Sequence, residues 1–111
     1  MALTGRSQSA FVTGVSEALP IASEATSSRV VVNNDLLRVV VFAMDAGQEL
    51  TAHASPRAVV VQQLQGTMRF WVGDDVRRLE PGDVVYLAPG QQHALVADTA
   101  CRFTLVMVDV G

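Results

Sequence analysis

Hydrophobic residues in this chain gather in short, valine-rich runs that polar or glycine-containing turns separate. The runs span residues 29–33, 36–44, 58–65, 67–72, 84–87 and 102–108. Short runs rich in β-branched residues are typical of strands, and turns that recur about every 8 to 12 residues are typical of antiparallel sandwiches and barrels. No stretch has a helical periodicity strong enough to compete with this pattern. The sequence therefore predicts an all-β fold.

The alternation of side chains along the predicted strands assigns each residue to one face of a sheet. The residues expected inside a closed barrel over residues 36–109 are Val40, Phe42, Val59, Val61, Gln63, Met68, Phe70, Leu105 and Met107. Trp71 falls on the opposite face, beside Arg69. Because an exposed indole ring is unfavourable and tryptophan is enriched at interfaces, we expect the N-terminal arm or the second copy of a homodimer to cover Trp71.

The first 27 residues differ in composition from the rest of the chain. They are rich in Ser, Ala and Thr, and Pro20 interrupts them. We therefore expect an arm over residues 1–27, with a short strand near residues 11–15, and a single barrel domain over residues 28–111. A chain of 111 residues is long enough for one hydrophobic core and too short for two.

Composition and charge exclude several classes of function. The net charge is −3 and there is no basic run, which argues against a nucleic-acid partner. All eight basic residues are arginines, so a lysine Schiff base and a P-loop lysine are excluded. Cys101 is the single cysteine, which rules out an internal disulfide. No apolar run is long enough to cross a membrane and the start lacks a signal-peptide pattern, so we expect a cytoplasmic protein without a membrane partner.

The candidate chemistry rests on the only two histidines of the chain, His53 and His93. Both lie in stretches that predict alternating strands, so we expect both side chains to point into the same enclosed space. Imidazoles that meet inside a barrel indicate a metal site or a proton-transfer site, because the neutral ring binds metals and titrates near neutral pH.

The segments around both histidines resemble the two sequence motifs of the cupin superfamily. The first motif is a glycine, five residues, His-x-His, three or four residues, a glutamate, six residues and a glycine. Gly47, His53 and Gly66 keep this spacing without an insertion. The metal-binding cupins use both histidines and the glutamate as ligands, but Ser55 stands at the second histidine position here and Val59 at the glutamate position.

The second cupin motif supplies the fourth ligand, a histidine that follows two glycines. Gly82, Gly90 and His93 match it, whereas Ala88 replaces its proline and Ala97 its asparagine. The resemblance implies a small single-domain cupin, an RmlC-like jelly roll or antiparallel double-stranded β-helix, with a degenerate metal-binding motif.

The resemblance also implies a metal site that has lost two of its four ligands. His53 and His93 would lie within about 3 to 4 Å of each other if they shared one ion. Two neutral imidazoles supply no charge compensation, so any divalent Zn, Ni, Fe or Mn ion should be weakly held and at low occupancy. The inward amide of Gln63 is the best further donor. The residues expected to line the ligand pocket are Ser55, Val59, Gln63, Tyr86, Phe42 and Met107.

Three functions stay open, each with a small-molecule ligand. The first is a metal-dependent cupin oxygenase or isomerase. The second is a metal-free enzyme with His53 or His93 as general base. Against it, the sequence places no carboxylate where it could orient the imidazole. The third is a non-catalytic binding or sensing module, which the loss of the anionic metal ligand favours. Arg57, after the Ser55-Pro56 corner, either sits at the barrel mouth and attracts an anionic ligand or is a solvated turn residue.

Overall fold

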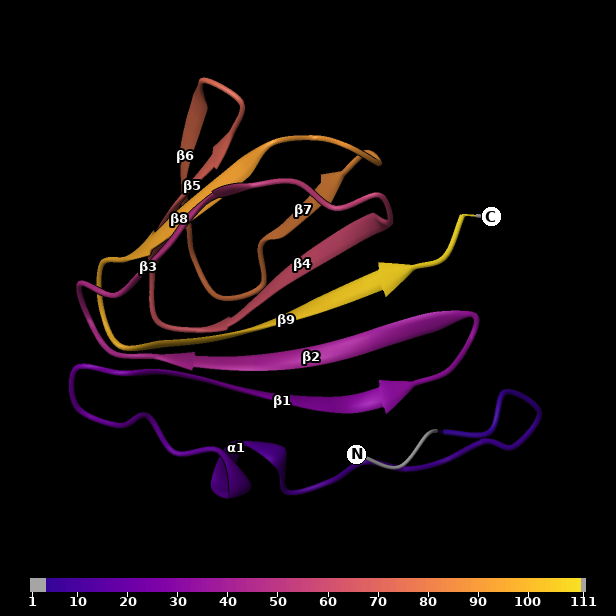
Figure 1. Cartoon of the computed structure of the whole chain (residues 1–111). Helices are drawn as coiled ribbons and strands as arrows, with labels where there is room; N and C mark the ends of the chain where they lie inside the picture. The colour runs from indigo at the N-terminus through magenta and orange to yellow at the C-terminus, as the bar shows by residue number, and fades with distance from the viewer. Residues whose placement is uncertain (1–3, 111) are drawn as a thin grey trace.

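The computed structural model describes residues 4–110, which fold almost entirely into β-strands. Within these residues one helical turn, α1 (Val15–Ala18), precedes the strands. The strands are β1 (Thr26–Asn33), β2 (Leu37–Met44), β3 (Glu49–His53), β4 (Ala58–Gln65), β5 (Met68–Val72), β6 (Asp75–Leu79), β7 (Val84–Leu87), β8 (His93–Ala97) and β9 (Cys101–Val108). They form two antiparallel sheets, in the orders β1-β2-β9-β4-β7 and β3-β8-β5-β6 (Figure 1). The prediction of an antiparallel all-β barrel is confirmed.

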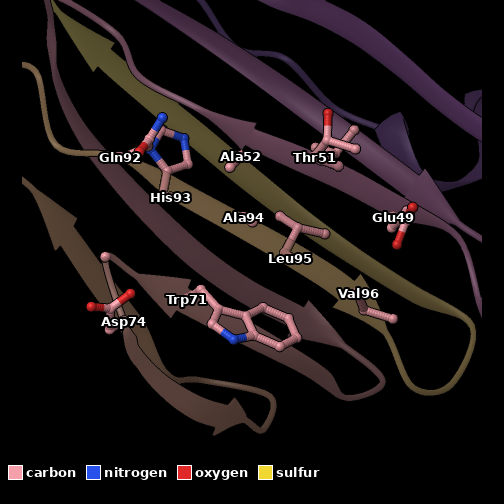
Figure 2. Close-up of a pocket in the computed structure, with 12 residues that line it drawn as sticks. Glu49, Thr51, Ala52, Trp71, Asp74, Gln92, His93, Ala94, Leu95 and Val96 are labelled. Atoms are coloured by element: carbon pink, nitrogen blue, oxygen red, sulfur yellow. The ribbon is translucent and has the colours of Figure 1, made fainter.

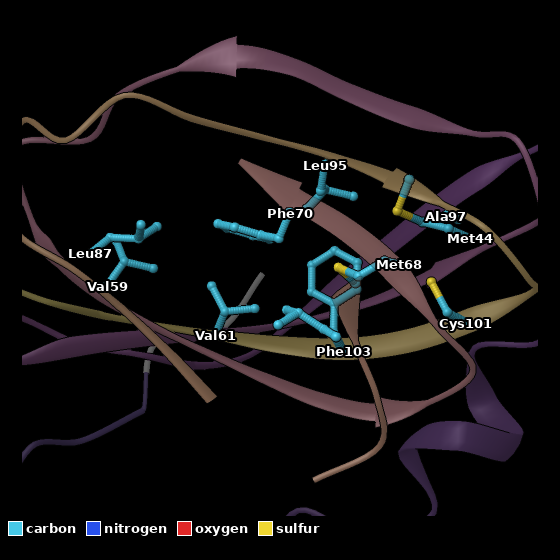
Figure 3. Packing of buried hydrophobic residues seen from close by; sticks show 11 residues of the cluster. Met44, Val59, Val61, Met68, Phe70, Leu87, Leu95, Ala97, Cys101 and Phe103 are labelled. Atoms are coloured by element: carbon cyan, nitrogen blue, oxygen red, sulfur yellow. The ribbon is translucent and has the colours of Figure 1, made fainter. Parts of the chain in front are cut away.

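The two sheets enclose one hydrophobic core (Figure 3). Its buried members are Met44, Val59, Val61, Met68, Phe70, Leu79, Leu87, Leu95, Ala97, Cys101 and Phe103. Of the residues predicted to lie inside, Val40 is also buried, while Phe42, Leu105 and Met107 are half-buried and pack against the core. The period-two alternation of β-branched and aromatic residues therefore assigned these faces correctly.

The N-terminal arm packs on the outer face of the five-stranded sheet. Leu19 is buried there against Val41 and Ala43 of β2. The guanidinium of Arg102 donates hydrogen bonds to the carbonyls of Ser16 and Leu19, at 3.2 and 3.3 Å. The arm therefore covers β2, and the expectation that its described residues cover Trp71, which belongs to the other sheet, is wrong.

Two local predictions also need correction. Residues 11–15 do not form a strand; the chain turns at Gly14, which has a φ of +67°, and enters α1. Glu17 in the first turn of α1 favours this helical turn electrostatically. Strand β6 lay outside the predicted strands because four of its five residues are exposed and only Leu79 is buried.

The strand register defines two ends of the barrel. At one end, which we call the histidine end, Val72 of β5 pairs with His93 of β8. At the other end, which we call the Gly66 end, Met68 pairs with Ala97. The two pairs are four residues apart along β8, which is about 13 Å in an extended strand. No helix within residues 4–110 is long and apolar enough to cross a membrane.

Candidate functional site

The structure brings the two histidines together at the histidine end. His53 ends β3, His93 begins β8, and the two residues are directly opposite in the ladder. Their ring centroids are 4.2 Å apart, and the ring planes are tilted by 59°. His93 is 5% exposed, whereas the His53 ring is open to solvent.

A β-bulge places His53 in this position. Leu50 pairs with Leu95, so regular pairing would set His53 opposite Gln92, but the register shifts between Leu50 and His53. One extra residue in β3 moves His53 opposite His93 and reverses the face of the strand that follows, as bulges do near binding sites. Thr51, which simple alternation puts on the same side as His53, instead lines a groove on the outer face of the sheet.

Backbone carbonyls fix the protonation of both rings. Nδ1 of His53 is 2.8 Å from the carbonyl oxygen of Thr51, and Nδ1 of His93 is 3.0 Å from that of Gln91. A carbonyl oxygen can only accept a hydrogen bond, so in the neutral rings each Nδ1 carries the hydrogen. Each Nε2 then keeps a free lone pair, and the pair of imidazoles presents two acceptors.

Burial favours the neutral form of His93. Desolvation lowers the pKa of His93 below its ordinary value of 6.5; the hydrogen bond to Gln91 opposes this shift, and the nearby His53 adds to it. The ring of Phe70 lies parallel to that of His93 with centroids 6.0 Å apart, so an aromatic side chain of the core is a neighbour of the imidazole. The site therefore combines a buried neutral imidazole with an accessible one.

The lowered pKa predicts a pH-dependent stability. Below about pH 6.5 the unfolded chain binds a proton at His93 that the folded chain resists, so the free energy of unfolding should decrease as the pH falls through this range. We expect His93→Asn to flatten this dependence in urea unfolding measured between pH 8 and pH 5. His53→Asn removes only the smaller contribution of the neighbouring ring and should leave most of the dependence in place, because desolvation is the largest cause of the shift. Equal slopes in the parent and in His93→Asn would contradict the assignment.

Other predicted site residues do reach the histidine end. Val59 is buried there, paired with Leu87 of β7 and Met107 of β9, in the interior position that a glutamate would occupy in a metal-binding cupin. The carbonyl of Ser55 accepts a 2.7 Å hydrogen bond from the amide of Gly90, which ties the β3–β4 corner to the loop before His93. The Ser55 hydroxyl accepts from the amide of Arg57 at 3.1 Å.

Arg57 has an unsatisfied group at this same end. Its Nη1 nitrogen is buried without a hydrogen-bond partner among the described residues. Arg57 lies two residues before Val59, whose side chain points inward, and its amide is bonded to the corner that holds the loop before His93. A buried N–H group without an acceptor is costly, so this nitrogen marks a position where a bound acceptor would be stabilised.

Three predicted lining residues lie elsewhere. Gln63 is at the Gly66 end, where its amide donates to the carbonyls of Gln65 and Gly66 at 3.1 and 2.9 Å. It holds the turn and is not a third donor for the histidines. Phe42 stacks on Phe103, in the same cross-strand row as Gln63. Tyr86 is 64% exposed on the outer face, because the alternation that buries Leu87 turns its neighbour outward.

The geometry does not fit a resident divalent ion. Within residues 4–110 no group of three His, Cys, Asp or Glu side chains is placed to hold a metal. His53 and His93 supply two neutral donors, whereas a stable site needs three or four donors and commonly an anion. Any metal at the pair would depend on water for the rest of its coordination.

A groove that sequence reasoning missed lies outside the barrel and is lined at one end by His93. It is a groove of about 430 Å³ on the outer face of the four-stranded sheet, with Trp71 on its floor (Figure 2). The only sequence signal for it was the outward position of Trp71, since the groove depends on the twist of β3, β8 and β5 and on the bulge in β3.

Comparison with known proteins now settles the family. The family described as the cupin domain matches residues 40–109. The chain belongs to the cupin family. No curated protein matches this cupin at a significant level.

Solved structures similar to this cupin include proteins with and without a described activity. A conserved protein of unknown function from Streptococcus pyogenes is 28% identical, with a TM-score of 0.84 over 100% of this chain and 97% of that one. A cupin superfamily protein from Desulfitobacterium hafniense is 15% identical, with a TM-score of 0.81 over 97% and 98%. The DMSP lyase DddQ from Ruegeria pomeroyi is 24% identical, with a TM-score of 0.71, over 77% of this chain and 47% of its own. The last two likenesses show the fold alone.

Proposed function

We propose that this cupin is a binding module whose histidine end holds a small organic molecule without a resident metal. The observation that carries the proposal is the pair of adjacent imidazoles whose Nδ1 hydrogens are both held by backbone carbonyls. The two free Nε2 acceptors suit a ligand that brings its own hydrogen, such as a hydroxyl or an amine.

The unsatisfied nitrogen of Arg57 supports a ligand that also carries an anionic group. A guanidinium binds a carboxylate through charge-assisted hydrogen bonds, which are about twice as strong as neutral ones. Two acceptors and one cationic donor at the same end of the barrel favour a small hydroxy acid. The buried Phe70 ring beside His93 favours an apolar body on this ligand.

The environment of the histidines favours binding over general-base catalysis. The Nδ1 atom of each ring faces a backbone carbonyl, at 2.8 and 3.0 Å, and not a carboxylate. A carbonyl orients an imidazole but does not stabilise its protonated form as a carboxylate does. The lowered pKa of His93 further weakens it as a base.

Mandelate provides a direct test, because it combines a hydroxyl, a carboxylate and an apolar ring. We expect mandelate to shift the imidazole ¹⁵N resonances and to bind about tenfold more tightly than phenylacetate, which lacks the hydroxyl, or mandelamide, which lacks the charge. Arg57→Gln should abolish the preference for mandelate over mandelamide. Arg29→Gln, an exposed arginine on β1, is the matched control and should leave that preference intact.

Two results would contradict the proposal. The first is that mandelate, phenylacetate and mandelamide bind equally, which would show that neither the imidazoles nor Arg57 recognises the ligand. The second is that none of them shifts the imidazole ¹⁵N resonances at ligand concentrations of tens of millimolar, which would show that the histidine end does not bind these ligands.

A further inference from the structure

The groove outside the barrel carries acidic side chains that the histidine pair does not use, although His93 lines one part of it. Its floor is formed by outward residues of adjacent strands, since Trp71 of β5 pairs with Ala94 of β8, and Val96 of β8 pairs with Glu49 of β3. Asp74, in the β5–β6 turn, lines the other end. Figure 2 shows the Trp71 indole with Asp74 on one side and Glu49 on the other.

The charge of the groove is negative. Glu49 and Asp74 line it beside His93, whose pKa burial lowers, and no arginine lines it. Neither carboxylate makes an ion pair or a side-chain hydrogen bond within the described residues. Most other carboxylates of the sheet are compensated, as Asp98 is by Arg69 at 2.8 Å. Two unpaired carboxylates beside an indole therefore give the groove a net preference for positive charge.

Trp71 already has a cation beside it. The guanidinium carbon of Arg69 lies 5.8 Å from the centre of the Trp71 ring, near the outer limit of a cation–π contact. The charge of this arginine is taken up by Asp98, so it does not neutralise Glu49 or Asp74. The groove volume of about 430 Å³ lies in the range of small-molecule sites.

We propose that this groove binds a small organic cation, an ammonium or guanidinium with an apolar body. The apolar body lies on Trp71, Ala94 and Val96, and the positive group lies at Glu49 or Asp74. The groove reaches the histidine end, where His93 also lines it, while Glu49, Trp71 and Val96 line it on the outer face of the sheet.

The sole tryptophan of the chain makes this proposal directly measurable. Titration with phenethylammonium should change the Trp71 emission, excited at 295 nm, along a saturable curve. The neutral analogue 2-phenylethanol should bind at least about fivefold more weakly, because it keeps the apolar body and loses the charge. The difference should shrink at high salt, since exposed carboxylates are screened.

Matched variants locate the charge. We expect Glu49→Gln and Asp74→Asn together to remove most of the preference for phenethylammonium over 2-phenylethanol. Glu24→Gln, which neutralises an exposed carboxylate in the segment before β1, should leave that preference unchanged. Unchanged thermal unfolding of the variants would show that the loss comes from the groove and not from misfolding.

Three results would overturn the proposal. The first is equal binding of the amine and the alcohol. The second is a preference for the amine that survives in the double variant. The third is an emission that changes with protein concentration alone while sedimentation shows a dimer, because then a second copy of the chain occupies the groove.

Discussion

Ser55→His and Val59→Glu together should raise the affinity of the barrel for Zn²⁺ by about 100-fold or more. The parent offers the Nε2 atoms of two neutral imidazoles. The double variant would add a third imidazole and a carboxylate, both at the histidine end, because Ser55 lies at the corner bonded to Gly90 and Val59 is buried beside Leu87. Donor number and charge compensation rise together, which is what a tetrahedral zinc site requires. Competition against a chromophoric chelator measures the change.

The single variants separate the two contributions. Val59→Glu alone places an uncompensated carboxylate in the core and should lower the melting temperature without metal. Zn²⁺ should recover more of this loss in the double variant than in Val59→Glu, because a ligand that binds only the folded state stabilises it in proportion to its affinity. If the double variant and the parent bind Zn²⁺ equally, the histidine end does not have the geometry of a degenerate metal site.

Gly66→Ala should be the most destabilising single change outside the core side chains. Gly66 has a φ of +72°, and an added Cβ would collide with the carbonyl of Ala100 and lie 2.9 Å from Cβ of Cys101. Its own carbonyl is tied to the Gln63 amide at 2.9 Å, so the turn has little freedom to move away. Left-handed strain and overpacking together should cost about 3 kcal/mol or more of the free energy of unfolding.

Gly47→Ala is the matched control for this prediction. Gly47 has a φ of +84°, but a Cβ there would have no heavy atom within 4 Å. Gly47→Ala should therefore lower the free energy of unfolding by only the cost of the left-handed backbone conformation, about 1 to 2 kcal/mol. Urea unfolding of both variants gives the comparison. An equal loss at the two glycines would show that the Gly66 end tolerates a side chain and is not closely packed.

The fold could be predicted from the sequence because its signal is local and repeated. Valine-rich runs with a period of two mark the strands, and the spacing of Gly47, His53, Gly82 and His93 resembles the cupin motifs. The elements that were not predicted are those without a regular pattern of hydrophobic residues. Strand β6 is mostly exposed, and the arm gains its helical turn only where it packs on β2.

The site was less predictable, because it depends on where strands deviate from regular alternation. The bulge in β3 decides which face His53 occupies, and no residue type in the sequence marks it. Gln63 has the inward parity of a ligand, yet its amide holds the turn at Gly66 instead. For Tyr86 regular alternation would have been enough. Leu87 points inward, so its neighbour Tyr86 must point outward, and it is indeed exposed.

Two features of the candidate sites could not be predicted from any single segment of the sequence. The outer groove at Trp71 is assembled from several strands, and the burial of the Arg57 nitrogen is a property of the folded chain alone. They could be recognised only once the register had placed these strands side by side.

The metal content of the untagged protein, measured by elemental analysis before and after dialysis against a chelator, distinguishes a metal-free ligand site from a resident metal centre. We expect well under one divalent ion per chain, its removal by a mild chelator, and an unchanged melting temperature afterwards. One tightly held ion per chain, whose removal lowers the melting temperature, would contradict the view that His53 and His93 form a metal-free ligand site.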